Sequence, residues 1–154
     1  MGNKQSVIML CHEKTKAFEA NLDDLQPSQL YISSDKLAAV ERSMHELENW
    51  HDVLVPVKRL TSKTVLIDGH TRALAAFRQG RRAIWAYWET EELDWEAYRI
   101  CMQWCVDEGI QSVVDLKARI VTEKPYKELW LKRCRAMHEA LDLQHNKRQG
   151  TIKP

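Results

Sequence analysis

Residues 65–76, VLIDGHTRALAA, are the stretch from which the fold of this chain can be predicted. Three consecutive apolar residues at its start are typical of a short buried strand, and an Asp-Gly pair breaks that strand. An alanine-rich helix is then expected over residues 72–79, opened by Thr71 or the residue before it, with Gly80 as its natural stop. The stretch therefore predicts a strand that passes through a glycine turn directly into a helix.

The turn between this strand and helix has the residues of an anion-binding site. The first N–H groups of a helix point outward at its positive dipole end, and Gly69 lets a phosphate approach the backbone closely. Thr71 offers a hydroxyl and Arg72 a bidentate guanidinium. His70 offers a hydrogen-bond donor or a titratable group, and Asp68 can bind a metal ion or act as a base. Residues 69–72 are thus the predicted phosphate cradle. Asp68 and His70 are the predicted catalytic residues, with Asp68 also the predicted Mg²⁺ ligand. In the simpler alternative, Asp68 and Thr71 only cap the helix and Arg72 lies in solvent.

Outward from this stretch, the pattern predicts an α+β chain. Strands are expected at residues 5–11, 16–21, 53–57, 65–67 and 83–88, and helices are expected to begin at Ser33 or Ser34, Asp94, Ser112 and Thr122. The strand at 83–88 is apolar on both faces and is expected to be central, whereas Pro56 is expected at the edge or end of a strand. Because every segment after Trp88 is predicted to be helical, the last third of the fold is a helical extension.

The composition fits one cytoplasmic domain. The chain has 154 residues, a formal net charge of +1 and four cysteines. The balanced charge argues against a wholly basic nucleic-acid-binding protein. The apolar runs are far shorter than the roughly 20 residues of a membrane span, and no signal peptide is expected, so the cysteines should be reduced. We expect a core at residues 1–88, a helical extension at 89–144 packed on the same domain, and a disordered basic tail at 145–154.

Several of these features occur together in a known pattern. Its parts here are Leu25-Gln26-Pro27, the helix 35–47, Val55-Pro56-Val57, Asp68-Gly69-His70-Thr71-Arg72 and Gly80. In this pattern, residues 22–88 resemble the ParB N-terminal/sulfiredoxin-like superfamily. The resemblance implies a small mixed sheet with helices, and a nucleotide-phosphate cradle at the Asp-Gly-His-Thr-Arg motif.

Three branches of this superfamily carry different residues at the motif. Sulfiredoxins have a reactive cysteine where this chain has His70, and ParB proteins have Gly-Glu-Arg-Arg. The free-serine kinases have Asp-Gly-His-x-Arg, which is the closest match. That resemblance implies a nucleotide-binding protein, and a phosphotransferase or ATPase that uses ATP or ADP with Mg²⁺ on a small-molecule substrate. The catalytic glutamate of these kinases corresponds to Gln29, which cannot accept a proton. The alternative carboxylates are Asp23, Asp24 and Asp35.

A nucleotide-responsive, DNA-associated module without catalysis is the alternative from a different class. Residues 117–135 carry seven basic and two acidic side chains and loosely resemble a helix-turn-helix. The acidic residues at 89–96 offset that charge, so we expect no salt-sensitive binding to duplex DNA. A third alternative is a pseudo-enzyme that binds a partner. The sequence indicates neither the substrate, nor the nucleotide base, nor an oligomeric state.

Three of the cysteines fall on the apolar stripes of predicted helices. They are Cys101, Cys105 and Cys134. Three thiolates can bind zinc, but structural zinc sites usually show a Cys-x-x-Cys spacing that this chain lacks. These cysteines are therefore predicted to be buried core thiols.

Overall fold

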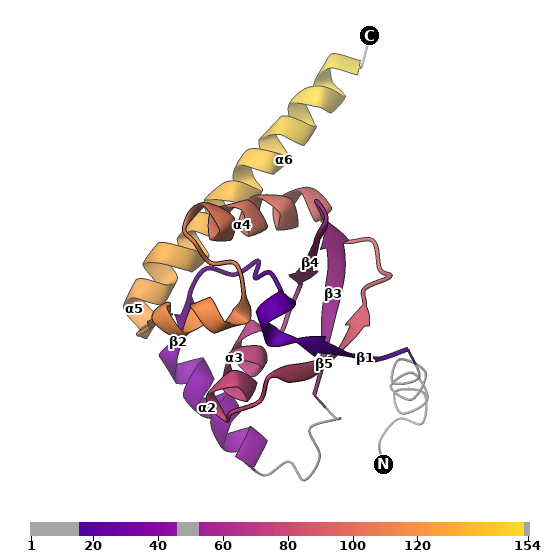
Figure 1. Ribbon diagram of the computed structural model, residues 1–154. Helices are drawn as coiled ribbons and strands as arrows, with labels where there is room; N and C mark the ends of the chain where they lie inside the picture. Colours follow the sequence, from indigo (N-terminus) through magenta and orange to yellow (C-terminus); the bar gives the residue numbers. More distant parts are fainter. Residues whose placement is uncertain (1–15, 46–52, 153–154) are drawn as a thin grey trace, which may run out of the picture.

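A four-stranded mixed sheet lies at the centre of the computed structural model, which describes residues 16–45 and 53–152 (Figure 1). Its strands are β1 (Phe18–Asn21), β3 (Leu54–Leu60), β4 (Lys63–Leu66) and β5 (Ala83–Trp88), in the order β1-β5-β3-β4. β5 pairs antiparallel with β1 and parallel with β3, and β3 and β4 form an antiparallel hairpin. The α+β fold class and the internal position of the strand at 83–88 are thus confirmed. The strand predicted at 5–11 lies outside the described residues.

The helices begin where the sequence predicts. They are α2 (Ser34–His45), α3 (His70–Arg78), α4 (Trp95–Asp107), α5 (Glu123–Tyr126) and α6 (Lys132–Ile152), with 3-10 segments η1 (Leu22–Asp24) and η3 (Val113–Ala118) and a π segment η4 (Lys127–Leu131) that joins α5 to α6. Asp94 caps α4 by accepting a hydrogen bond from the N–H of Ala97, and Ser112 forms a capping box with Asp115. Among the described residues, no helix has the length and apolar character needed to cross a membrane.

Two segments of the C-terminal third differ from the prediction. The short helix after Ser112 is a 3-10 helix, and the chain then forms β6 (Ile120–Val121), which pairs parallel with β2 (Ile32–Ser33). This segment therefore lacks the two consecutive α-helices of a helix-turn-helix. Residues 145–152, predicted to be a disordered tail, form the last turns of α6. Figure 1 shows this end of α6 projecting beyond the rest of the fold. Residues 145–149 include neither glycine nor proline, and the helix also continues through Gly150, which it tolerates at a cost of about 1 kcal/mol relative to alanine.

Pro56 lies within an internal strand of the sheet. The sequence instead predicts this proline at the edge or end of a strand. β3 runs between β5 and β4, but its pairing with β4 begins only at Val57, opposite Leu66. The missing N–H of Pro56 therefore falls at the end of the β3–β4 ladder. Its carbonyl is still used, because it accepts a 3.0 Å hydrogen bond from the N–H of Ile67. Proline is tolerated at this position since no ladder hydrogen bond is lost.

Both faces of the sheet are packed against helices. On one face, Val57 of β3 joins Leu37 of α2 and Leu74 of α3 in the main core. On the other face, a smaller cluster joins Leu60 of β3 to Met102 of α4. Residues that alternate along β3 thus contact different helices, as the period of a strand requires. As a result, the edge at which β4 ends and α3 begins lies between the two helical layers.

Candidate functional site

The turn between β4 and α3 requires glycine at position 69. Gly69 is the N-cap of α3 and has a φ of +82°, in the left-handed region. A Cβ atom there would lie 2.7 Å from Cγ1 of Val55 and 2.8 Å from Nη2 of Arg72. The space left by the missing side chain is thus occupied by two side chains of the same protein. Gly69 brings the guanidinium of Arg72 directly against the start of the helix.

The first turn of α3 has no side-chain cap. Its first helical hydrogen bond runs from the N–H of Ala73 to the carbonyl of Gly69, at 2.9 Å. The preceding N–H groups of the turn have no partner inside the helix and are available to an anion. Asp68, which is exposed, accepts the N–H of Gly69 at 2.8 Å through Oδ1. The predicted helix cap by Asp68 is therefore limited to this contact with the adjacent residue.

Arg72 is tied to the sheet as well as to the turn. Its Nη1 donates a 3.2 Å hydrogen bond to the carbonyl of Leu54 in β3, and the side chain is half-buried. This contact uses one of the five N–H donors of the guanidinium. Thr71, on the same turn, is also half-buried. The simpler alternative, in which Arg72 is a free solvent-exposed side chain, does not describe this arrangement.

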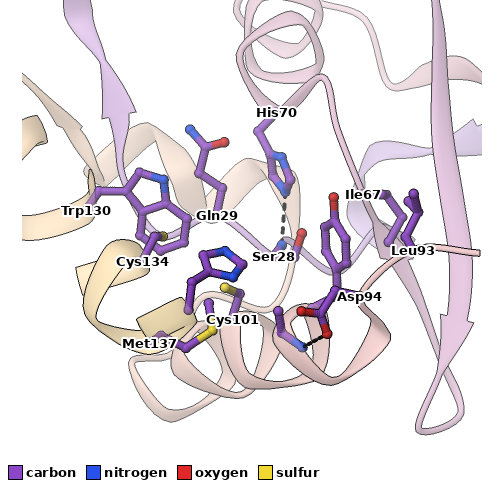
Figure 2. A pocket seen from close by; sticks show the side chains of 13 residues that line it. Ser28, Gln29, Ile67, His70, Leu93, Asp94, Cys101, Trp130, Cys134 and Met137 are labelled. Atoms are coloured by element: carbon purple, nitrogen blue, oxygen red, sulfur yellow. Dashed lines mark hydrogen bonds between the residues drawn. The ribbon is translucent and has the colours of Figure 1, made fainter. Parts of the chain in front are cut away.

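A cleft of about 390 Å³ opens beside this turn. Four segments form it: the loop before β2, the end of β4 with the start of α3, α4 with the residue that caps it, and the continuous helix of η4 and α6. The lining residues are Ser28, Gln29, Ile67, His70, Leu93, Asp94, Ala97, Tyr98, Cys101, Trp130, Cys134, Met137 and His138. Figure 2 shows side chains from all four segments around the same space. Of the five predicted site residues, only His70 lines this cleft.

His70 is a buried histidine whose ring accepts a hydrogen bond. Only 3% of its surface is exposed, and its Nε2 accepts a 3.0 Å hydrogen bond from the N–H of Ser28 (Figure 2). Burial lowers the pKa of His70 to about 4, and the charge of Asp68 only partly opposes this shift. Because Nε2 accepts, the proton of the neutral ring is on Nδ1. Nδ1 has no hydrogen-bond partner among the described residues, and it is not among their fully buried polar atoms. It can therefore donate to a ligand in the cleft.

The loop that carries Ser28 is fixed along β4. The hydroxyl of Ser28 donates a 2.7 Å hydrogen bond to the carbonyl of Leu66. Two residues earlier, Gln26 forms a parallel bridge to Val65, and its buried side chain donates to the carbonyls of Pro27 and Ile110. The N–H of Ser28 is thus held in place by the sheet, and the orientation of the His70 ring follows from it.

Gln29, which the sequence resemblance aligns with the kinase glutamate, also lines the cleft. Its Nε2 donates to the carbonyl of Tyr31 at 2.9 Å and lies 3.4 Å from the hydroxyl of Tyr126. The structure therefore brings Gln29 and His70 to the same space, although 41 positions separate them in the sequence. The alternative carboxylates Asp23 and Asp35 do not line the cleft, and neither does Asp24.

The carboxylate that does line the cleft is Asp94. Its Oδ1 caps α4 by accepting the N–H of Ala97 at 3.1 Å, which leaves the other carboxylate oxygen without a role in the cap. The sequence predicts Asp94 as a helix cap and as part of the acidic residues at 89–96. It does not predict Asp94 in the same cleft as His70, because that depends on how α4 folds over the sheet. Asp68 lies close by, since burial and then the charge of Asp68 raise the pKa of Tyr98, another lining residue.

The three described cysteines do not share one environment. Cys105 is completely buried, and burial raises the pKa of its thiol to about 12. Cys101 and Cys134 instead line the cleft, one from α4 and one from α6. The prediction of core thiols is confirmed for Cys105 and for Cys101, which is buried in the main core, whereas Cys134 is half-buried against it. The prediction does not include the cleft that Cys101 and Cys134 line. Among the described residues, no group of three or more His, Cys, Asp or Glu side chains is placed to hold a metal ion.

Comparisons with solved structures give partial similarities, two of which are described here. No protein-family model matches the chain, and no curated protein matches it. The protein Atu1540 from Agrobacterium tumefaciens is similar over 73% of this chain and 65% of its own, with 15% sequence identity and a TM-score of 0.48. The C-terminally truncated chromosome-partitioning protein ParB from Caulobacter crescentus, complexed with CTP-gamma-S, is similar over 59% of this chain and 53% of its own, with 18% identity and a TM-score of 0.41. The present chain thus spans less than two thirds of the length of either structure.

Proposed function

We propose that this protein binds a nucleotide whose phosphates lie at the start of α3, and a small molecule in the adjacent cleft. The observation that carries the proposal is that α3 begins without a side-chain cap, directly after Gly69, with the Arg72 guanidinium against the same glycine. Helix N–H groups and a guanidinium are the donors that bind phosphates best. The resemblance of residues 68–72 to the free-serine kinase motif favours ATP or ADP with Mg²⁺.

The residues at this turn fit both the phosphates of a nucleotide and a Mg²⁺ ion bound to them. The guanidinium of Arg72 keeps donors free beyond its bond to Leu54, and the first-turn N–H groups have no helical partner. Mg²⁺ is commonly held by one or two carboxylates together with substrate phosphates. Asp68 is an exposed carboxylate at the same turn and is the candidate ligand. When bound with a nucleotide, Mg²⁺ neutralises charge on the phosphates.

Phosphotransfer to a small molecule is the reaction class that the cleft supports best. His70 presents a neutral N–H donor there, which can orient an acceptor molecule. Transfer to a hydroxyl also needs a group that orients or deprotonates the acceptor. Gln29 cannot take a proton, whereas Asp94 is a carboxylate in the same cleft. We therefore expect nucleotide binding to be readily measured and turnover to be slow.

Calorimetric titration of ATP, ADP, CTP and GTP, each with and without Mg²⁺, tests the binding step. Arg72→Ala should weaken the preferred nucleotide by about 1.5–3 kcal/mol, the range for hydrogen bonds to charged groups. Arg78→Ala is the matched control, because Arg78 ends the same helix and pairs with Glu41 at 3.5 Å. Thermal unfolding of each variant shows whether the fold is retained. Equal affinities for Arg72→Ala and the wild type would remove Arg72 from the site, and the absence of binding by every nucleotide would overturn the proposal.

A further inference from the structure

Two thiols from different helices meet at the wall of the cleft. Cys101 lies on α4 and Cys134 on α6, and a side-chain hydrogen bond joins them. Both line the cleft, so a small molecule that enters it can reach them (Figure 2). Cys105, one helical turn after Cys101, is completely buried and does not line the cleft. The pair is therefore distinguished by position from the third described cysteine.

The two thiols are not equivalent. Cys134 is half-buried, and its hydrogen bond with Cys101 and the charge of Arg133 lower the pKa of its thiol. Arg133 is held next to it by stacking on Trp104, at 4.0 Å from the ring centre, and by pairing with Glu108 at 3.3 Å. Cys101 is buried, and its hydrogen bond with Cys134 and its burial raise its pKa far above the ordinary value. A more accessible thiol with a lowered pKa beside a buried second thiol is the arrangement of a redox-sensing pair.

We propose that Cys101 and Cys134 are a peroxide-reactive dithiol site, in which Cys134 is the attacking thiol and Cys101 the resolving thiol. The Cys134 thiolate attacks one oxygen of a hydroperoxide, forming an S–O bond while the O–O bond breaks and the second oxygen leaves, after protonation, as water or an alcohol. The sulfur of Cys101 then attacks the Cys134 sulfenic acid. An S–S bond forms, the S–O bond breaks, and the oxygen leaves as water with the Cys101 proton. Overall, two thiols are oxidised and one peroxide is reduced.

The disulfide would change the cleft. Hydrogen-bonded sulfur atoms must approach to about 2.05 Å when the bond forms. That approach draws α6 toward α4 and moves the wall that carries Trp130 and Met137, which lie on the continuous helix with Cys134. The π segment η4 comes immediately before α6, and such segments are places where a helix can adjust. Thiol reductants reverse the bond by exchange, as for other redox-sensing disulfides.

The experiment uses the reduced full-length chain and hydrogen peroxide, with no nucleotide, so its result does not depend on the proposed function. Intact-mass and peptide mass spectrometry should show the loss of two hydrogen atoms and a Cys101–Cys134 crosslink. Tryptophan fluorescence should change at the same rate and recover with dithiothreitol, because Trp130 contacts Trp104 edge-on in this wall. Cys105→Ala is the matched control and should oxidise like the wild type.

Two further variants assign the roles. Cys101→Ala should stop at a sulfenic acid on Cys134 that dimedone captures, and Cys134→Ala should form neither the adduct nor the crosslink. Cys101→Ser serves as a second resolving-thiol variant if circular dichroism shows that Cys101→Ala is not folded. A wild-type chain that stays reduced, a disulfide that uses Cys11 or Cys105, or unchanged oxidation of folded Cys134→Ala would each overturn the proposal.

Discussion

The backbone N–H of Ser28 donates a 3.0 Å hydrogen bond to Nε2 of His70, across 42 positions of the sequence. The two residues are held together by β4, since the hydroxyl of Ser28 bonds the carbonyl of Leu66 just before the turn. Protonating Nε2 would break the bond to Ser28 and leave two N–H groups facing each other. The contact and the burial of the ring therefore favour neutral His70 with its proton on Nδ1.

The stability of the protein should depend on pH through His70. Its pKa is about 4 in the folded chain, below the ordinary value of 6.5. Between these pH values the unfolded chain binds more protons, so the free energy of unfolding falls as the pH falls from 6.5 toward 4. At about 1.4 kcal/mol per pKa unit, the His70 contribution to this loss reaches about 3 kcal/mol. Denaturant unfolding from pH 4 to 8 measures it.

The control is His70→Gln, which keeps an acceptor for the Ser28 N–H but does not titrate. Carboxylate titrations are common to both proteins, so the difference between their two stability curves isolates His70. That difference should flatten above about pH 6.5. Parallel curves over the whole range would show that His70 titrates normally in the folded chain.

Gly69→Ala should destabilise the protein more than Gly80→Ala. Both glycines have positive φ, at +82° and +87°, so both substitutions pay the left-handed backbone penalty of about 1–2 kcal/mol. At Gly69 the new Cβ also meets Val55 and Arg72 at under 3 Å, whereas at Gly80 it meets nothing within 4 Å. The extra overpacking cost is about 1–3 kcal/mol. Equal losses in denaturant unfolding would mean that Val55 and Arg72 move aside freely.

The local structure around Gly69 could be predicted from the sequence, whereas the cleft beside it could not. The strand, glycine turn and helix around Gly69 follow from short-range rules, as do the caps at Asp94 and Ser112, because each depends on residues a few positions apart. The cleft could not be predicted, since it assembles four segments that meet only after the helices pack on the sheet. For the same reason the helical spacing predicts Cys101 and Cys134 as core residues but does not show that they and Asp94 line one cleft.

Substitutions of Asp94 should distinguish its role as the cap of α4 from a role in the cleft. Asn and Asp are comparable N-caps, so Asp94→Asn should leave thermal stability nearly unchanged, while Asp94→Ala should cost about 1 kcal/mol. If the free carboxylate oxygen acts on the small molecule, Asp94→Asn should lose turnover as fully as Asp94→Ala does. Activity that follows stability across the two variants would limit Asp94 to its cap on α4.

The DNA-associated alternative predicts binding to duplex DNA whose affinity falls steeply as the salt concentration rises. A protein that neutralises several phosphates loses affinity steeply with salt, at about −0.9 in log–log slope for each phosphate. We expect no such binding to duplex DNA, because Glu108 pairs with both Arg119 and Arg133, and Glu123 pairs with Lys127. Fluorescence anisotropy with labelled duplex from 50 to 200 mM salt measures this. Submicromolar affinity that is lost over that range of salt would support the DNA-associated alternative.

Gln29→Glu should increase phosphotransfer, at a cost in stability. Gln29 donates through Nε2 to the Tyr31 carbonyl, and a glutamate oxygen there would face that carbonyl without a proton, which costs about 1–3 kcal/mol. The hydroxyl of Tyr126, 3.4 Å from Nε2, can instead donate to the new carboxylate and keep it in the cleft. A carboxylate in reach of the acceptor hydroxyl contributes about 10²–10⁴-fold to proton transfer, so turnover of free serine with ATP or ADP should rise by up to that factor.

The Gln29→Glu experiment compares phosphoserine formation by wild type, Gln29→Glu and Asp68→Asn. Gln29→Met is the matched control, because it loses the same hydrogen bonds without gaining a carboxylate. Turnover that appears only in Gln29→Glu would identify the natural protein as a binding module on a kinase-like site. Brisk wild-type turnover would show instead that the reaction does not need a carboxylate at position 29, and its loss in Asp68→Asn would agree with Asp68 as the Mg²⁺ ligand.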